Sequence, residues 1–163
     1  RWRCHRSRPR GARLKRRAVE TYDIASVLMH LENGVAGTLL ANRSAWGRKG
    51  RIAIQIFGSK GSILYDQERM NEFQLYLTAD RPTEQGYRTI LVAPHHRPYD
   101  AFLPAPGHGL GFNDLKIIEC RELLTRLAGK PARIIDFDEG LEIERTVHAM
   151  ARSFEEQRWV DVR

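Results

Sequence analysis

A chain of 163 residues, of which 42% are hydrophobic and 29% charged, has the size and composition of one globular domain. It has no apolar run near the ~20 residues that a transmembrane helix needs and no secretory apolar segment, which excludes an integral membrane class. The two cysteines, Cys4 and Cys120, form no metal-binding or redox motif, so we expect a reducing, cytoplasmic location.

The net charge of +7 comes from the start of the chain. Residues 1–17 contain nine Lys or Arg and no acidic residue, and without these nine cations the net charge of +7 falls to −2. Such an arm can bind nucleic acid through phosphate contacts, which is one alternative function. Its lack of helical periodicity favours a disordered arm that folding does not require. We therefore expect an arm at 1–17 and a domain at 18–163.

Residues 22–66 predict four consecutive antiparallel strands joined by short turns. Apolar residues occupy both faces of 22–31, which predicts a central strand covered on each side. Asn33-Gly34 then predicts a hairpin turn, because both residues tolerate positive φ. A second hairpin is predicted at Gly58-Ser59-Lys60-Gly61, after a run in which isoleucines alternate.

The remainder of the chain predicts two more strands and then two helices. The strands are expected at 73–78 and 87–93, before an irregular segment rich in Pro and Gly at 94–111. Apolar residues at helical spacing predict helices capped by Asn113 and Asp138, and Gly129 ends the first. Short strands are also expected at 132–135 and 159–162. The order predicts an α+β fold: an open, mostly antiparallel sheet with helices on one face.

Three motifs resemble ligand sites but occur in the wrong context. The sequence Gly107-His108-Gly109-Leu110-Gly111 lacks the preceding strand and the βαβ unit of a dinucleotide fingerprint. The glycines at 58–61 link two strands, without the helix whose amides would bind phosphate, so we interpret them as a turn. His95, His96 and His108 have no nearby cysteine, and adjacent histidines in an extended segment point apart, so we expect no metal site.

Five short segments, taken together in order and spacing, resemble the C-terminal half of the Gfo/Idh/MocA dehydrogenases. This family includes inositol dehydrogenase-like and glucose–fructose oxidoreductase-like enzymes. The segments are VETYDIA (19–25), FGSKGS (57–62), ERMNE (68–72), PGHGLGF (106–112) and RWVDV (158–162). The resemblance covers about residues 18–163.

The resemblance implies the substrate-binding and oligomerisation domain of a two-domain enzyme whose Rossmann domain binds NAD or NADP. The family's glycine-rich nucleotide motif, its Glu-Lys-Pro motif and its Asp-x-x-x-His pair are missing from these 163 residues. Hydride transfer needs a positioned nicotinamide and a base. We therefore expect no catalytic or cofactor-binding residue here, an inactive fragment, and a homodimer formed by the uncovered sheet face. A non-enzymatic relic of the domain is the alternative.

Polar residues that such a domain could direct at a sugar or polyol are Arg43, Arg48, Tyr99, His108 and Asn113. The two arginines follow the second predicted strand, and a guanidinium can donate several hydrogen bonds to hydroxyls. The histidine lies between glycines, where the backbone can approach a ligand closely. The tyrosine and the asparagine flank the irregular segment. The alternatives are surface positions for the arginines and packing or helix capping for the last two.

Overall fold

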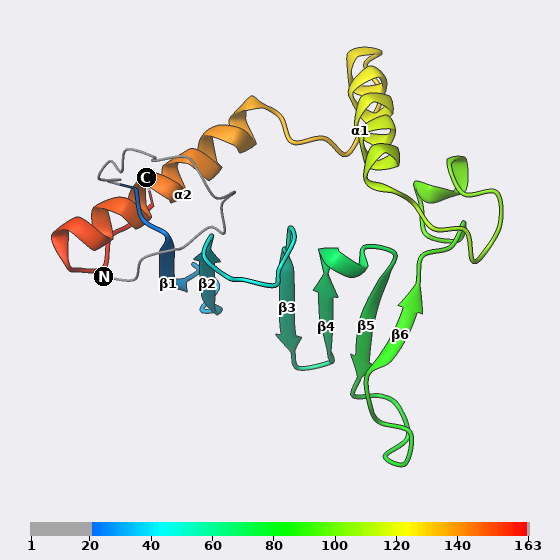
Figure 1. Cartoon of the computed structure of the whole chain (residues 1–163), viewed down its shortest axis with the longest axis horizontal. Coiled ribbons are helices and arrows are strands. Elements are labelled where there is room, and N and C mark those ends of the chain that lie inside the picture. Colours follow the sequence, from blue (N-terminus) through cyan, green and yellow to red (C-terminus); the bar gives the residue numbers. More distant parts are fainter. Residues whose placement is uncertain (1–20, 163) are drawn as a thin grey trace, which may run out of the picture. The chain divides into compact units, whose positions relative to one another are not determined.

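The computed structural model describes residues 21–162, and Figure 1 shows their elements in chain order. These residues divide into two compact units, one of 21–48 with His148–Asp161 and one of Lys49–Val147 with Val162. The expected α+β class with open antiparallel sheets is confirmed. The predicted arm at 1–17 lies outside the described residues. No helix in the described part is both long and apolar enough to cross a membrane.

The first unit contains a two-stranded hairpin of β1 (Ile24–His30) and β2 (Ala36–Asn42). Gly34 has a φ of 81°, and Val35 N donates to Asn33 Oδ1 at 3.1 Å. The Asn-Gly turn predicted from sequence is therefore confirmed, because a left-handed residue and a side-chain acceptor close this hairpin.

The expectation that this first strand is central and covered on both sides is wrong. Among the described residues β1 pairs with β2 alone, and Leu28 is 67% exposed.

The strand expected at 159–162 is an irregular segment that is held by other contacts. The Trp159 ring lies 4.9 Å from the His30 ring, and Arg152 Nη2 donates to Asp161 O at 2.8 Å.

The second unit contains an antiparallel sheet in the order β3-β4-β5-β6. Its strands are β3 (Ala53–Gly58), β4 (Gly61–Asp66), β5 (Glu72–Leu77) and β6 (Arg88–Leu91). The expectation that residues 22–66 form one four-stranded meander is thus wrong, because β2 and β3 belong to different sheets. Between β2 and β3 the chain forms turns instead of the backbone hydrogen bonds of a strand pair, and in one of these turns Ser44 N donates to Asn42 Oδ1 at 2.9 Å.

The turn predicted between β3 and β4 is confirmed by the pairing of Gly58 with Gly61. A Cβ atom at position 61 would overlap the carbonyl oxygen of Tyr76 on β5. Glycine is therefore required there by the close approach of the neighbouring strand, not by a phosphate.

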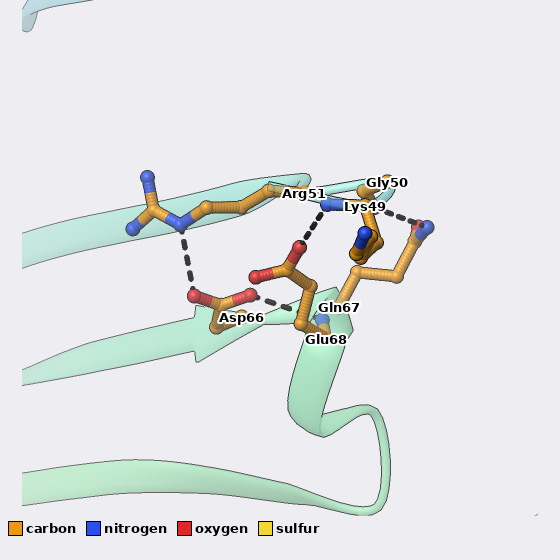
Figure 2. A network of polar contacts seen from close by, with 6 residues as sticks. All are labelled: Lys49, Gly50, Arg51, Asp66, Gln67 and Glu68. Atoms are coloured by element: carbon orange, nitrogen blue, oxygen red, sulfur yellow. Dashed lines mark hydrogen bonds and ion pairs between the residues drawn. The ribbon is translucent and has the colours of Figure 1, made fainter. Parts of the chain in front are cut away.

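A polar network fixes the entry into β3 against the end of β4 (Figure 2). Arg51 Nε donates to Asp66 Oδ2 at 2.9 Å, and Lys49 N donates to Glu68 Oε1 at 2.6 Å. Gln67 Nε2 donates to the Gly50 carbonyl at 3.0 Å. Asp66 Oδ1 also accepts from Glu68 N at 3.0 Å, which caps the short helix η1 (Gln67–Arg69). The carboxylate of Asp66 therefore binds both the segment before β3 and the first turn of η1.

Asn71, between η1 and β5, holds three segments together. Its Nδ2 donates to Leu110 O at 2.9 Å, and its Oδ1 accepts from Leu110 N at 2.7 Å. Its backbone oxygen accepts from Val92 N at 2.8 Å. A Cβ at position 109 would lie 3.1 Å from Asn71 Nδ2, so glycine there allows the close approach. The side chain of Asn71 thereby pairs with the Leu110 backbone as a strand residue would.

Helix α1 (Phe112–Leu127) begins two positions earlier than the sequence predicts. Gly111 is its N-cap, and Asp114 Oδ2 accepts from Gly111 N at 2.6 Å. The predicted cap at Asn113 is therefore wrong, since this asparagine already lies in the first turn. The predicted end is confirmed by Gly129, whose φ of 73° suits the residue after a helix.

Helix α2 (Phe137–Glu156) is also capped by a different residue from the one expected. Asp136 Oδ1 accepts from the backbone nitrogens of Asp138 and Glu139, each at 3.1 Å, so the predicted cap at Asp138 is wrong. The strand expected at 132–135 is irregular. Glu122 on α1 accepts from Arg133 N at 2.9 Å, which satisfies a donor that a strand would have used.

Asp66→Ala should lower the free energy of unfolding by about 1–2 kcal/mol, because it removes both the cap of η1 and the partner of Arg51. Asp66→Asn should cost less, since its amide oxygen still accepts from Glu68 N. Glu84→Ala, which removes the exposed partner of Arg81, is the matched control and should cost under about 0.5 kcal/mol. Urea unfolding followed by circular dichroism measures all three. Equal losses in Asp66→Ala and Glu84→Ala would contradict the role of the network.

Asn71→Ala should lower the free energy of unfolding by about 1–3 kcal/mol, because it leaves the peptide groups of buried Leu110 without their partner. Hydrogen exchange at the Leu110 amide should become faster in the same variant. Gln74→Ala, the loss of an exposed amide side chain from β5, is the control and should leave that exchange unchanged. Slow exchange at Leu110 in Asn71→Ala would show that other contacts hold this segment.

Candidate functional site

A cavity of about 270 Å³ lies within the second unit, where the facing ends of β4 and β5 meet the segment after β6 and the start of α1. Pockets for drug-sized ligands measure roughly 300–1,000 Å³, so this cavity suits a single small ring. Its apolar lining consists of Met70, Phe73, Val92, Leu110 and Leu115.

The sheet register places the aromatic part of this lining. Phe73 on β5 lies opposite Tyr65 on β4 and opposite Ile90 on β6, so the three side chains share one face of the sheet. Leu110 is 8% exposed and reaches the cavity because Asn71 holds its backbone. The cavity therefore depends on a register set by neighbouring strands and on a contact made across 39 residues of sequence.

Polar side chains complete the lining, and they come from four places in the chain: Tyr65, Asn71, Glu72, His96 and Tyr99. The phenol of Tyr65 is a neutral donor, because burial, with smaller contributions from Tyr99 and Asp66, raises its pKa above the usual 10.0. Tyr99 begins the short helix η2 (Tyr99–Ala101), where its carbonyl accepts from Leu103 N at 2.8 Å.

His96 is oriented by its own backbone turn. Its Nδ1 accepts from Ala93 N at 3.1 Å, and His96 N donates to Ala93 O at 2.9 Å. A nitrogen that accepts a hydrogen bond carries no proton, so the ring proton is on Nε2 in this arrangement. Nε2 is then a donor, like the two phenol groups.

Glu72 contributes the one carboxylate among the described residues that line the cavity. Its Oε1 lies 2.5 Å from Arg69 Nε, and the Glu72 side chain is 20% exposed whereas that of Arg69 is 73% exposed. The counter-cation is therefore in solvent while the carboxylate borders the cavity. None of the described lining residues is Lys or Arg.

The arrangement provides hydrogen-bond donors and one strong acceptor around an apolar aromatic surface. A polyhydroxylated ring has the complementary features, namely hydroxyls at its edge and C–H groups on its faces. Among the described residues no group of three His, Cys, Asp or Glu is placed to hold a metal ion. The size and lining of the cavity suit a small polar ring.

The described residues do not fit a dinucleotide. Every strand pair among them is antiparallel, whereas a dinucleotide fold is built from parallel βαβ units. The glycine-rich segment before α1 follows an irregular region and not a strand, and the Asn71 side chain lies directly beside Gly109. Gly109 allows the close approach of the Asn71 side chain, and Gly107 has a positive φ of 85°.

The structure places the five residues predicted from sequence at different locations. Tyr99 lines the cavity. His108 is exposed, with its Nδ1 3.2 Å from Ala105 O, and Asn113 is exposed in the first turn of α1. Arg43 and Arg48 belong to the first unit, and Arg43 Nε lies 3.5 Å from Asp23 Oδ1 with both side chains exposed.

Sequence reasoning did not select Tyr65, Glu72 or His96. For Tyr65 a signal existed, since it is a polar aromatic residue near the end of a strand whose neighbours on the same face are apolar. Glu72 lies in the segment 68–72 that carries part of the family resemblance, but its side chain alone indicates only a surface acid. His96 was considered as a metal ligand, and its bond to Ala93 N has no sequence signal.

Comparison with known proteins gives the same family across nearly the whole chain. The family model described as the oxidoreductase family, C-terminal alpha/beta domain, matches residues 4–162. A levoglucosan dehydrogenase from Pseudarthrobacter phenanthrenivorans is 29% identical over 153 residues, which is 94% of this chain and 39% of that protein.

Solved structures agree with the sequence match. A levoglucosan dehydrogenase in complex with NADH and levoglucosan has a TM-score of 0.84 at 30% identity, covering 88% of this chain and 39% of its own. An NAD binding oxidoreductase from Klebsiella pneumoniae has a TM-score of 0.84 at 32% identity, covering 90% and 40%. The chain thus spans about two-fifths of the length of these relatives. It belongs to the Gfo/Idh/MocA oxidoreductase family, to whose C-terminal α/β domain it corresponds.

Proposed function

We propose that these residues form the substrate-binding and oligomerisation domain of an NAD(P)-dependent sugar or polyol dehydrogenase. The cavity beside Phe73 carries this proposal, because it combines three hydroxyl-directed donors with a carboxylate acceptor in a space that suits one ring. The relative solved with NADH and levoglucosan supports a sugar as the substrate class. Inositols are also polyhydroxylated six-membered rings, and they belong to the proposed substrate class.

The chain's own contribution to the reaction would be positioning of the substrate. Tyr65, Tyr99 and His96 would donate to ring hydroxyls, and Glu72 would accept from one of them. Holding the ring in one orientation favours hydride transfer, because a fixed geometry removes the entropy cost of alignment in the reacting complex. NAD or NADP would supply the hydride acceptor when the whole enzyme binds it. The described residues on their own would then be inactive.

Exposed apolar residues on the second sheet support the proposed homo-oligomer. Ile56 pairs with Ile63 and Ile54 pairs with Tyr65, so all four side chains lie on the same face. Ile54, Ile56 and Ile63 are 49%, 57% and 38% exposed. Contiguous apolar surface of this kind marks interaction sites, and sheets can pack face to face about 10 Å apart. We propose a two-fold homodimer through this face, in a cytoplasmic protein whose Cys120 is an exposed free thiol.

The dimer is tested by a charge placed on this face. Ile56→Glu should convert the dimer to a folded monomer, because the new carboxylate would lose its solvation in the interface. Gln55→Glu is the matched control, since it places the same group on the adjacent residue and the opposite face. Multi-angle light scattering at micromolar concentration reports the mass. A monomeric unmodified chain, or equal masses for the two variants, would contradict the proposed interface.

Sugar binding is tested with the tyrosines of the cavity. The unmodified chain should bind levoglucosan or myo-inositol in an NMR titration, with shifts at residues of the cavity. Tyr65→Phe and Tyr99→Phe should each weaken binding by about tenfold, since each removes one donated hydrogen bond.

Tyr87→Phe is the control, because Tyr87 lies outside the cavity and its ring faces Tyr76 at 6.1 Å. It should leave the affinity unchanged. NADH, titrated in parallel, should not bind. NMR shifts confined to residues outside the cavity, or micromolar binding of NADH, would contradict the proposal that these residues bind the sugar and not the cofactor.

A further inference from the structure

We propose that Glu72 makes the cavity selective by charge, so that it accepts neutral and amine-bearing monosaccharides and rejects monosaccharides that carry a carboxylate or a phosphate. This inference rests on the proposed sugar-binding function and assigns that site a specificity-determining residue. The observation behind it is the asymmetry of charge at the cavity: a carboxylate borders it, and none of the described lining residues is a cation.

The partly buried location of Glu72 strengthens the electrostatic effect of its charge. Its side chain is 20% exposed and borders the cavity at the first residue of β5. The effective dielectric at a half-buried position is lower than that of water, so a second negative charge nearby is repelled more strongly than at the surface. A ligand anion would also lose its hydration without gaining a charged partner, because the groups that face it are neutral donors.

The ion pair with Arg69 does not remove this effect. The Arg69 side chain is 73% exposed and does not line the cavity, so its charge is screened by water and salt. It holds the Glu72 carboxylate in place through the contact of 2.5 Å between Nε and Oε1. One oxygen of the carboxylate is thus engaged with Arg69, and a carboxylate has a second oxygen with which it can accept from a hydroxyl or ammonium group.

The remaining polar lining has no positive charge to offset Glu72. Nδ1 of His96 accepts from Ala93 N, which requires a neutral ring in this geometry. Tyr65 and Tyr99 donate neutral hydroxyls, and the Asn71 amide is already paired with Leu110. Neutral donors of this kind suit sugar hydroxyls, whereas a carboxylate or phosphate is normally recognised by Arg or Lys.

A matched series of pyranoses tests the inference on the 163-residue chain. D-Glucose is neutral, D-glucosamine carries an ammonium group at neutral pH, and D-glucuronate carries a carboxylate. In NMR titrations at pH 7, D-glucuronate should bind about tenfold or more weakly than D-glucose. D-Glucosamine should bind at least as tightly as D-glucose. The preference should persist at high salt, because half-buried charges are screened less than exposed ones.

Glu72→Gln should reduce the difference between D-glucose and D-glucuronate to less than about threefold, since it keeps the shape of the side chain and removes its charge. Glu84→Gln, which removes a carboxylate outside the cavity, should keep the full preference. Arg69→Ala should keep or widen the preference, because it removes only a screened counter-ion and leaves the Glu72 charge in place. This exposed substitution also keeps the test available if Glu72→Gln does not fold.

The outcomes separate this inference from the proposed function. If D-glucose binds in the cavity and D-glucuronate binds equally well, the charge selectivity is wrong and the sugar site stands. A preference that survives in Glu72→Gln, or that is lost in Arg69→Ala, would show that Glu72 is not its source. If none of the three sugars binds, the sugar site itself is wrong and the selectivity with it.

Discussion

The paired hydrogen bonds between the Asn71 side chain and the Leu110 backbone are the contact on which the candidate site depends. Among the described residues only Leu103, Leu110 and Ala149 are buried apolar side chains, so a large core does not fix the segment before α1. Polar contacts do so instead, and the same asparagine accepts from Val92 N. Because the cavity lies among these segments, its shape follows from one amide side chain that behaves like a strand residue.

The apolar surface that remains exposed has a consequence for assembly. One face of the second sheet presents isoleucines, and the last two turns of α1 expose Leu123, Leu124 and Leu127. Surfaces of this kind are stable in proteins mainly when another surface covers them. The chain spans about two-fifths of the length of its relatives, and the proposed homodimer would cover the isoleucine face. Tyr65 lies on the same sheet face as the exposed isoleucines and also lines the cavity, so the cavity borders the apolar face of the second sheet.

Local features of this fold could be predicted from the sequence, and features that depend on distant contacts could not. Asn33-Gly34, the turn at 58–61 and the helix end near Gly129 follow from backbone preferences, and the structure confirms them. The two caps were misassigned by two residues each, because α1 begins after Gly111, whose amide is bonded by Asp114, and the amides at the start of α2 are bonded by Asp136. The separation of β2 from β3 could not be foreseen, since a short connection between two strand-like runs does not determine whether they pair. Tyr99 was identified as a candidate, but the cavity that it lines joins residues up to 50 positions apart, from Tyr65 to Leu115.

Hydrogen exchange along the whole chain, measured with and without a saturating neutral monosaccharide, tests the central claim most directly. The account predicts that bound sugar slows exchange together in three separate segments, namely the adjoining ends of β4 and β5, the turn around His96 and the residues from Leu110 to Leu115. The hairpin of β1 and β2, which contributes nothing to the cavity, should exchange at the same rate in both conditions. Protection of that hairpin alone, or protection of one of the three segments without the others, would contradict a sugar site assembled around Asn71.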